Sequence, residues 1–239
     1  MTVPPPAVRE RLMLALDVPD PQTARRLVAD LGDSVVFYKI GLELFLSGGY
    51  FELADWLRER GKRVFADLKL FDVPQTVGAA VRQLVRRDID FVTVHGNDEI
   101  LRAAREAGGD RPGILAVTVL TSLDRADMED LGFRTDVSAV VVSRARRAEG
   151  IGCAGVIASG QEAARIRAVV SDGFRIVVPG IRPASARGSD DQKRTVDVEE
   201  AFEAGADYIV VGRPIRNASD PAEAAESIQE RIASVFGEG

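Results

Sequence analysis

The sequence predicts a (β/α)8 barrel, a closed ring of parallel strands surrounded by helices, built as one catalytic domain over residues 1–239. Eight short apolar runs alternate strictly with eight amphipathic stretches along the chain. A doubly wound open sheet also alternates, but eight such units in 239 residues favour a closed barrel. No change in composition marks a second domain. Polar residues collect just after the apolar runs, where barrels of this type carry their active sites.

The expected strands are short, and most are continuously apolar, as parallel strands buried on both faces are. They cover residues 12–17, 35–40, 63–69, 91–95, 114–118, 155–158, 175–178 and 208–211. The expected helices cover residues 21–31, 42–60, 73–87, 99–107, 137–149, 161–170, 196–204 and 221–235. Pro21 suits the first turn of a helix, and Gly32 and Gly61 each follow a helix end.

The longest irregular segment, residues 179–195, follows the seventh expected strand. A long loop in a compact domain is more often a lid or a binding loop than a spacer. We therefore expect this segment to be mobile when the site is empty and ordered over a bound ligand.

The composition excludes several classes of protein. The chain is 46% hydrophobic and 28% charged, which is typical of a soluble globular domain. Its net charge of −6 gives it no general attraction for nucleic acid or for an anionic membrane. No apolar run resembles a signal peptide or a membrane span. Cys153 is the only cysteine, so an intrachain disulfide and a thiolate metal cluster are excluded, and a cytoplasmic location is expected.

Four charged residues end the first three expected strands. They are Asp17, Lys39, Asp67 and Lys69. Strand alternation turns Asp67 and Lys69 to the same face, so the four could form a ring of alternating charge inside the barrel mouth. A structural ion-pair network is the alternative, but burying four charges at adjacent strand ends is costly, which favours a functional site. Only four of the 31 basic residues are lysines; this bias can reflect base composition, but lysine can release a proton and arginine cannot.

A phosphate site is expected at the last two strand ends. Gly212 and Arg213 follow the eighth strand, where barrels of this type commonly bind phosphate. Glycine lets backbone N–H groups approach an anion, and arginine offers two parallel donors. Arg182, on the long loop, could be a second clamp; alternatively, it is a solvated surface arginine.

The single histidine and the acidic residues near the strand ends each raise a further possibility. His95, the only histidine, has no nucleophile motif beside it, so it is expected either to line the mouth of the barrel or to be a hydrogen-bonded core residue. A metal site built from Asp17, Asp67 and Asp72 is conceivable, but two lysines in the same cluster would neutralise the carboxylates.

The run Asp67-Leu68-Lys69-Leu70-Phe71-Asp72-Val73-Pro74-Gln75-Thr76 closely resembles the signature of orotidine 5′-phosphate decarboxylases. Related phosphosugar barrels share the Asp-x-Lys-x-x-Asp element, but other blocks of the family also occur in order. They are residues 14–17, 37–41, 117–122, 179–182, 191–192 and 211–215. The resemblance thus covers almost the whole chain. It departs at Gln75, where the family usually has asparagine, and at residues 95–98, so His95 receives no catalytic role.

The resemblance implies decarboxylation of orotidine 5′-monophosphate to UMP, without a metal or an organic cofactor. It makes Lys69 the proton donor to C6 of the pyrimidine and places Asp67 beside the substrate carboxylate. Lys39 and Asp17 would complete the charged network and contact the ribose. The remaining implied substrate contacts are Thr121 and Ser122 at the base, and Arg182, Gln192, Gly212 and Arg213 toward the phosphate. Asp72 and Thr76 would reach into the active site of a partner in a homodimer.

The chemistry agrees with this assignment. Loss of CO2 from C6 leaves a carbanion that needs a fixed positive charge and then a proton, and lysine supplies both. A Mg²⁺-dependent 3-keto-gulonate-phosphate decarboxylase of the same barrel type is the nearest alternative. Lys39 argues against it, because a metal site would prefer a carboxylate there. A catalytically silent phosphate-binding barrel is the other alternative, and it would be expected to lack a complete charge ring.

Overall fold

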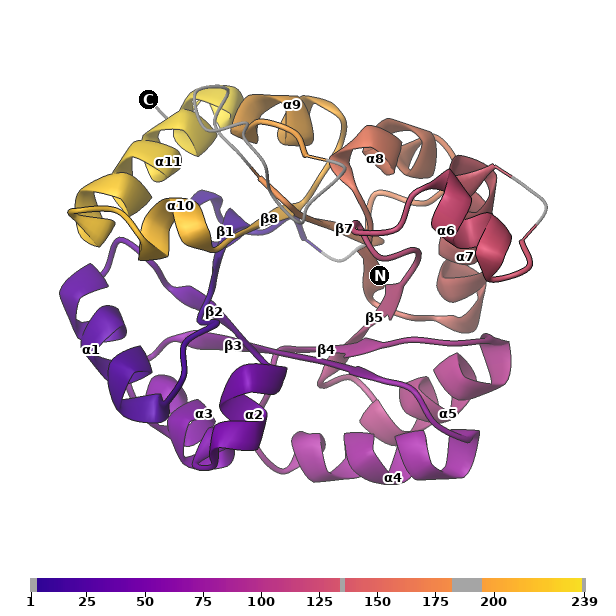
Figure 1. The fold of residues 1–239 in the computed structure, drawn as a ribbon, viewed down its shortest axis with the longest axis horizontal. Helices are drawn as coiled ribbons and strands as arrows, with labels where there is room; N and C mark the ends of the chain where they lie inside the picture. Colours follow the sequence, from indigo (N-terminus) through magenta and orange to yellow (C-terminus); the bar gives the residue numbers. More distant parts are fainter. Residues whose placement is uncertain (1–3, 134–135, 182–194, 238–239) are drawn as a thin grey trace.

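A computed structural model describes residues 4–133, 136–181 and 195–237 of the chain. Eight parallel strands lie in sequence order around a closed barrel, and β8 pairs with β1. The helices form an outer ring around the strands (Figure 1). The predicted (β/α)8 architecture is therefore confirmed.

The strands agree with the predicted runs to within two residues at every end. They are β1 Leu12–Ala15, β2 Phe37–Gly41, β3 Arg63–Leu70, β4 Phe91–Val94, β5 Gly113–Val117, β6 Gly155–Ile157, β7 Arg175–Pro179 and β8 Tyr208–Val211. Because β1 ends at Ala15, Asp17 lies in the loop that follows the strand.

The helices differ from the prediction in number. They are α1 Pro21–Leu31, α2 Leu42–Ser47, α3 Tyr50–Glu59, α4 Pro74–Val85, α5 Asp98–Gly108, α6 Arg125–Asp130, α7 Val137–Ile151, α8 Gly160–Arg167, α9 Val198–Glu203, α10 Arg213–Arg216 and α11 Pro221–Phe236, with a 3-10 turn at Val8–Arg11. The single helix expected over residues 42–60 is wrong. Gly48 and Gly49 have φ angles of 84° and 70°, which interrupt the helix between α2 and α3. The short helices α6 and α10 were not predicted.

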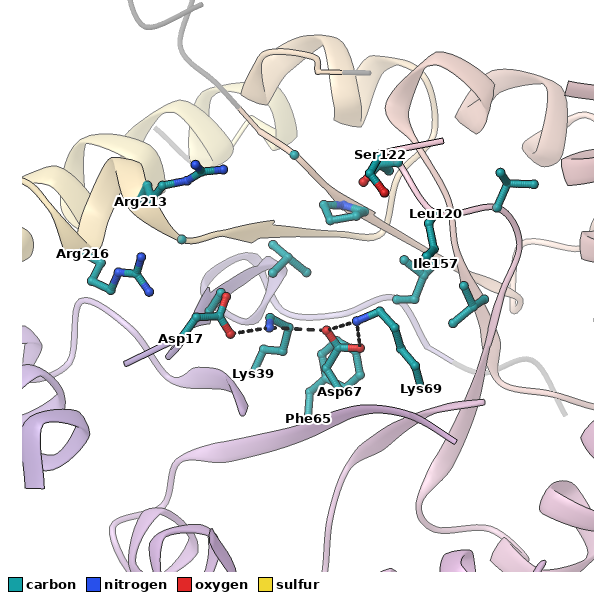
Figure 2. Close-up of a pocket in the computed structure, with 18 residues that line it drawn as sticks. Asp17, Lys39, Phe65, Asp67, Lys69, Leu120, Ser122, Ile157, Arg213 and Arg216 are labelled. Atoms are coloured by element: carbon teal, nitrogen blue, oxygen red, sulfur yellow. Dashed lines mark hydrogen bonds and ion pairs between the residues drawn. The ribbon is translucent and has the colours of Figure 1, made fainter. Parts of the chain in front are cut away.

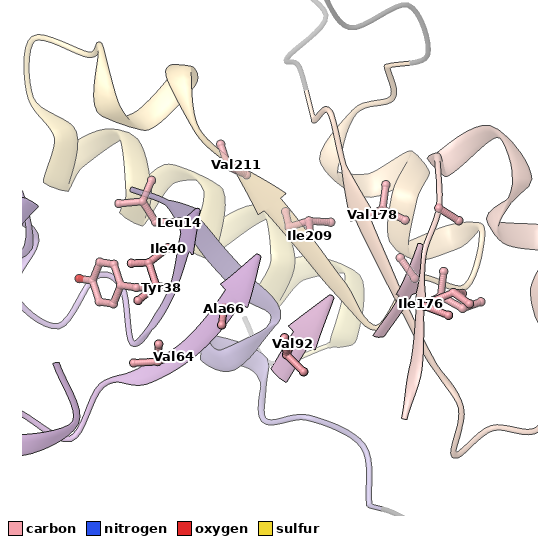
Figure 3. Packing of buried hydrophobic residues seen from close by; sticks show 14 of the residues in the cluster. Leu14, Tyr38, Ile40, Val64, Ala66, Val92, Ile176, Val178, Ile209 and Val211 are labelled. Atoms are coloured by element: carbon pink, nitrogen blue, oxygen red, sulfur yellow. The ribbon is translucent and has the colours of Figure 1, made fainter. Parts of the chain in front are cut away.

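Strand alternation produces two apolar layers. Side chains that point into the barrel pack around Phe37, Phe65, Leu115 and Val177. Side chains that point outward pack against the helices; Figure 3 shows Leu14, Tyr38, Ile40, Val64, Ala66, Val92, Ile176, Val178, Ile209 and Val211 in this layer. The barrel is therefore a filled core and not a pore, and substrate can enter only at its ends.

The end of β3 is irregular. Its pairing with β4 shifts register between Ala66 and Leu70, and Lys69 has a φ angle of 46°. This left-handed conformation is uncommon outside glycine and costs about 1–3 kcal/mol, so the surrounding structure must hold it. Simple alternation placed Lys69 on the correct face but did not predict this irregularity.

The other end of the barrel carries a charged cluster with a structural role. Asp90 has a side chain that is 1% exposed, and its carboxylate pairs with Arg58, Arg63 and Arg111 at 3.1, 3.0 and 2.6 Å. It also accepts the backbone N–H of Val64 at 2.9 Å. Both carboxylate oxygens of Asp90 thus have hydrogen-bond partners, as is usual for buried polar groups.

None of the described helices is both long and apolar enough to span a membrane.

Candidate active site

The four charged residues predicted at the first three strand ends lie together. Lys39 Nζ donates to Asp17 Oδ1 at 2.9 Å and lies 3.3 Å from Asp67 Oδ2. Lys69 Nζ donates to both carboxylate oxygens of Asp67 at 2.9 Å. Figure 2 shows the resulting row of alternating charge, Asp17, Lys39, Asp67 and Lys69, along the floor of a cavity.

The inner pair of this charge ring is buried, and the outer pair is more open. The side chains of Lys39 and Asp67 are 10% and 12% exposed, against 37% for Lys69 and 46% for Asp17. Burial lowers the pKa of Lys39, but Asp67 and Asp17 outweigh it, so this pKa lies above its ordinary value. Burial likewise raises the pKa of Asp67, but Lys39 and Lys69 outweigh it and hold this pKa below its ordinary value. Both groups are therefore charged at neutral pH.

Thr93 of β4 is a member of the site that the sequence analysis missed. Its side chain is fully buried, and its hydroxyl donates to Asp67 Oδ1 at 2.9 Å. The Thr93 hydroxyl oxygen also accepts the backbone N–H of Lys69, at 2.9 Å. Thr93 therefore ties the carboxylate to the irregular backbone that carries Lys69. A polar residue at an inward position of an apolar strand was the available signal.

The charge ring forms the floor of a cavity of about 530 Å³ at the C-terminal ends of the strands. Thr121, Ser122, Gly212 and Arg213 line it, so four further predicted site residues lie around the same space. The apolar part of the wall comes from six strands and the loop after β5. It consists of Ala15, Phe65, Val117, Val119, Leu120, Ile157, Pro179 and Val210. An apolar wall above a charged floor suits a small organic ligand that carries an ionised group.

Other predicted residues do not line the cavity. Asp72 and Thr76 are exposed and lie outside it. Arg182 and Gln192 lie outside the described residues, as does most of the loop over residues 179–195.

His95 matches neither role expected for it. It is absent from the cavity lining, and its ring packs edge-on against Phe71, with 5.2 Å between ring centroids. Its Nδ1 atom is buried and, within the described part of the chain, has no hydrogen-bond partner. Burial, with Arg144 and Lys69 nearby, lowers the pKa of His95, so the ring is neutral at pH 7.

The conceivable metal site does not form. Within residues 4–133, 136–181 and 195–237, no three His, Cys, Asp or Glu side chains are placed to hold a metal ion. Asp72 is exposed and does not line the cavity, and the carboxylates of Asp17 and Asp67 each pair with a lysine.

A model of the orotidine 5′-phosphate decarboxylase / HUMPS family matches residues 10–228, which include the charge ring and the cavity. The chain belongs to this family. Among orotidine 5′-phosphate decarboxylases, it is 57% identical over 235 residues to the protein of Methylococcus capsulatus, covering 98% of this chain and 97% of that one. It is 53% identical over 228 residues to the protein of Stenotrophomonas maltophilia, covering 95% and 94% of the two chains.

Solved structures of orotidine 5′-phosphate decarboxylases share the fold. The crystal structure from Lactobacillus acidophilus has a TM-score of 0.83 and 33% sequence identity, and covers 93% of this chain and 99% of its own. The structure from Pyrococcus horikoshii has a TM-score of 0.74 and 29% identity, over 92% and 98% of the two chains. Membership of the orotidine 5′-phosphate decarboxylase family, which the sequence resemblance predicted, is confirmed.

Proposed function

We propose that this chain converts orotidine 5′-monophosphate to UMP and CO2, as a carboxy-lyase of pyrimidine nucleotide synthesis. The observation that carries the proposal is the charge ring on the floor of a cavity whose rim holds Gly212 and Arg213. The ring faces the end of the substrate that loses CO2, and the rim faces the phosphate. The free, buried thiol of Cys153 suits a reducing compartment, and we assign the enzyme to the cytoplasm.

Lys69 is assigned as the proton donor. When the bond between C6 and the carboxylate carbon breaks, its electron pair stays on C6 and the carbon leaves as CO2. The Lys69 ammonium stabilises this negative charge and then transfers a proton to C6, after which solvent reprotonates the amine. Lys69 has the more open of the two ammonium groups, with 37% of its side chain exposed against 10% for Lys39, so it is the one a substrate can reach.

Asp67 and Lys39 are assigned as the residues that hold Lys69 and orient the substrate. Asp67 binds Lys69 through both carboxylate oxygens and stays ionised because its pKa is lowered. The fixed carboxylate of Asp67 repels the substrate carboxylate, and this repulsion is relieved as neutral CO2 forms. Preorganised stabilisation of the transition state supplies the larger part of the rate enhancement. Lys39 lies between the two carboxylates, and with Asp17 it would contact the ribose.

The phosphate end supplies binding energy far from the bond that breaks. We assign the phosphate to Arg213 and the Gly212 backbone, together with Arg182 and Gln192 of the loop, and the base to Thr121 and Ser122. Remote binding of this kind can drive closure of a loop and order the reacting groups. The chain's own lysines supply the charge and the proton, so the proposal requires neither a metal nor an organic cofactor.

We further propose that the working unit is a homodimer in which Asp72 and Thr76 complete the partner's site. Both residues are exposed and lie beside exposed apolar side chains on the same segment, Phe71 (68% exposed) and Val73 (60%). Leu42, Phe45 and Leu46 of α2 are also exposed, at the same end of the neighbouring strand. Exposed apolar side chains gathered in this way are typical of an association surface.

A spectrophotometric assay with orotidine 5′-monophosphate in excess EDTA tests the proposal. We expect full turnover in chelator. Activity that disappears with EDTA and returns with Mg²⁺ would instead support the metal-dependent phosphosugar decarboxylase. Tight binding of UMP without any turnover would support a silent binding barrel.

A further inference from the structure

Arg216 is a cavity residue to which neither the charge ring nor the family blocks of the sequence assign a role. It ends α10, the single helical turn that begins at Arg213. Residues three apart on a helix lie on the same side, and both arginines line the cavity. Figure 2 shows their side chains extending from α10 toward the cavity, above the floor that Asp17 begins.

The lining of the cavity carries more basic than acidic side chains. Its lining holds two carboxylates, two ammonium groups and two guanidinium groups. The carboxylates of Asp17 and Asp67 are already paired with Lys39 and Lys69. The lining therefore carries two more positive than negative charges, in a chain whose net charge is −6.

Arg216 has no acidic partner among the described residues. Its one hydrogen bond runs from Nε to Oδ1 of the adjacent Asn217, at a long 3.5 Å. Other surface arginines of this chain do find carboxylates; Arg147, for example, binds both oxygens of Asp98, at 2.8 and 2.7 Å. The guanidinium of Arg216 is thus available to an anion in the cavity.

We propose that Arg216 is a second guanidinium for the substrate phosphate and helps the enzyme select a phosphate ester over the uncharged nucleoside. This inference rests on the proposed function. A phosphate monoester carries a charge of about −1.5 to −2 at pH 7, which matches the excess in the cavity lining. Guanidinium groups bind phosphate oxygens through two parallel N–H donors, and the pair on α10 can contact different oxygens of one phosphate.

Four proteins test this inference: the wild type, Arg216→Gln, Arg216→Lys and Arg146→Gln. Arg146 is an exposed arginine of α7 that does not line the cavity, so its variant loses the same charge elsewhere. For Arg216→Gln we expect kcat/KM for orotidine 5′-monophosphate to fall roughly 10- to 100-fold, the range for one charge-assisted hydrogen bond. Turnover of orotidine, which lacks the phosphate, should stay within about twofold of wild type. The kcat/KM of Arg216→Lys for orotidine 5′-monophosphate should lie between those of the wild type and Arg216→Gln. The kcat/KM of Arg146→Gln should match that of the wild type.

Titration calorimetry with UMP and with uridine gives a readout that does not need turnover. We expect Arg216→Gln to weaken UMP binding by a similar factor and to leave uridine binding unchanged. Unchanged UMP affinity, or equal losses for UMP and uridine, would overturn the role of Arg216. A wild-type protein that binds UMP but does not turn over the substrate would instead contradict the proposed function, and the UMP-to-uridine affinity ratio would still test Arg216.

Discussion

Thr93 Oγ1 lies 2.9 Å from Asp67 Oδ1, so a hydroxyl of β4 holds a carboxylate of β3 that in turn holds the ammonium of Lys69. The same hydroxyl accepts the Lys69 backbone N–H, at the residue where β3 takes a left-handed φ angle. One buried side chain therefore fixes both ends of the Asp67–Lys69 pair. Neighbouring groups that lock a reacting side chain in this way are a general requirement of precise active sites.

Replacing Thr93 with valine should mainly slow the chemical step. Valine has a similar shape but neither donates to Asp67 nor accepts from Lys69. We expect kcat to fall roughly tenfold or more with little change in KM, because misplaced reacting groups affect the transition state more than substrate binding. The unfolding free energy should fall by about 1–3 kcal/mol, since the partly buried Lys69 N–H loses its acceptor. Thr93→Ser, which keeps the hydroxyl, should retain most activity; equal losses in both variants would contradict the role.

Lys69→Ala should abolish turnover, because the proposed proton donor and one of the two ammonium groups of the site are lost together. The variant should keep its circular dichroism spectrum and bind UMP, since the phosphate contacts remain. Lys69→Arg should also be inactive, because arginine keeps its proton at any accessible pH. Substantial residual decarboxylation by either variant, measured by the loss of substrate absorbance, would remove Lys69 from this role.

Asp67 should stabilise the fold in a pH-dependent way. Its pKa is lowered in the folded state, so its contribution is present above the unfolded pKa of about 3.9 and is lost as the pH falls through the lower folded value. We expect Asp67→Asn to lower the unfolding free energy at pH 7 by about 3–5 kcal/mol, because it leaves Lys39 buried with one partner fewer. The difference between the two proteins should begin to shrink below about pH 4, where this carboxylate protonates in the unfolded chain, and should continue to shrink as the pH falls toward the lower folded pKa. Urea titrations at pH 7 and pH 3.5 measure it, and a constant difference would contradict the electrostatic origin.

The raised pKa of Lys39 predicts a loss of folding stability at high pH. Its contribution to stability is present below the unfolded lysine pKa of about 10.4 and is lost as the pH rises through the higher folded value. Wild-type unfolding free energy should therefore decline in strong alkali. Asp17→Asn should show a smaller decline that ends at a lower pH, because Lys39 then loses one of its two carboxylates and its folded pKa is raised less. An identical alkaline profile for the two proteins would argue against the pair.

Mixing two inactive variants tests whether Asp72 serves the partner's site. If it does, a heterodimer of Lys69→Ala and Asp72→Ala chains has one site with both defects and one intact site. Random exchange of subunits should then restore about a quarter of wild-type activity, since half the dimers are mixed and each has one of two sites intact. No recovery after verified exchange would show that Asp72 acts within its own chain or has no role. Sedimentation of Phe71→Glu, expected to be monomeric, tests the interface itself.

The sequence by itself determined the barrel, the order of its strands and the face on which Asp67 and Lys69 lie. These properties follow from the period of apolar residues along a strand, which is local information. It also placed Asp17 and Lys39 at neighbouring strand ends, because consecutive parallel strands lie side by side in a closed barrel.

Only the tertiary structure decided how these residues meet. The contact of Thr93 with Asp67 crosses 26 positions of sequence and depends on the shifted register of β3 against β4. The cavity position of Arg216 depends on an unpredicted helical turn after β8, and the break between α2 and α3 depends on two glycines inside an otherwise helical pattern. Side-chain contacts between distant segments arise from packing in three dimensions, which no periodicity along one strand or helix encodes.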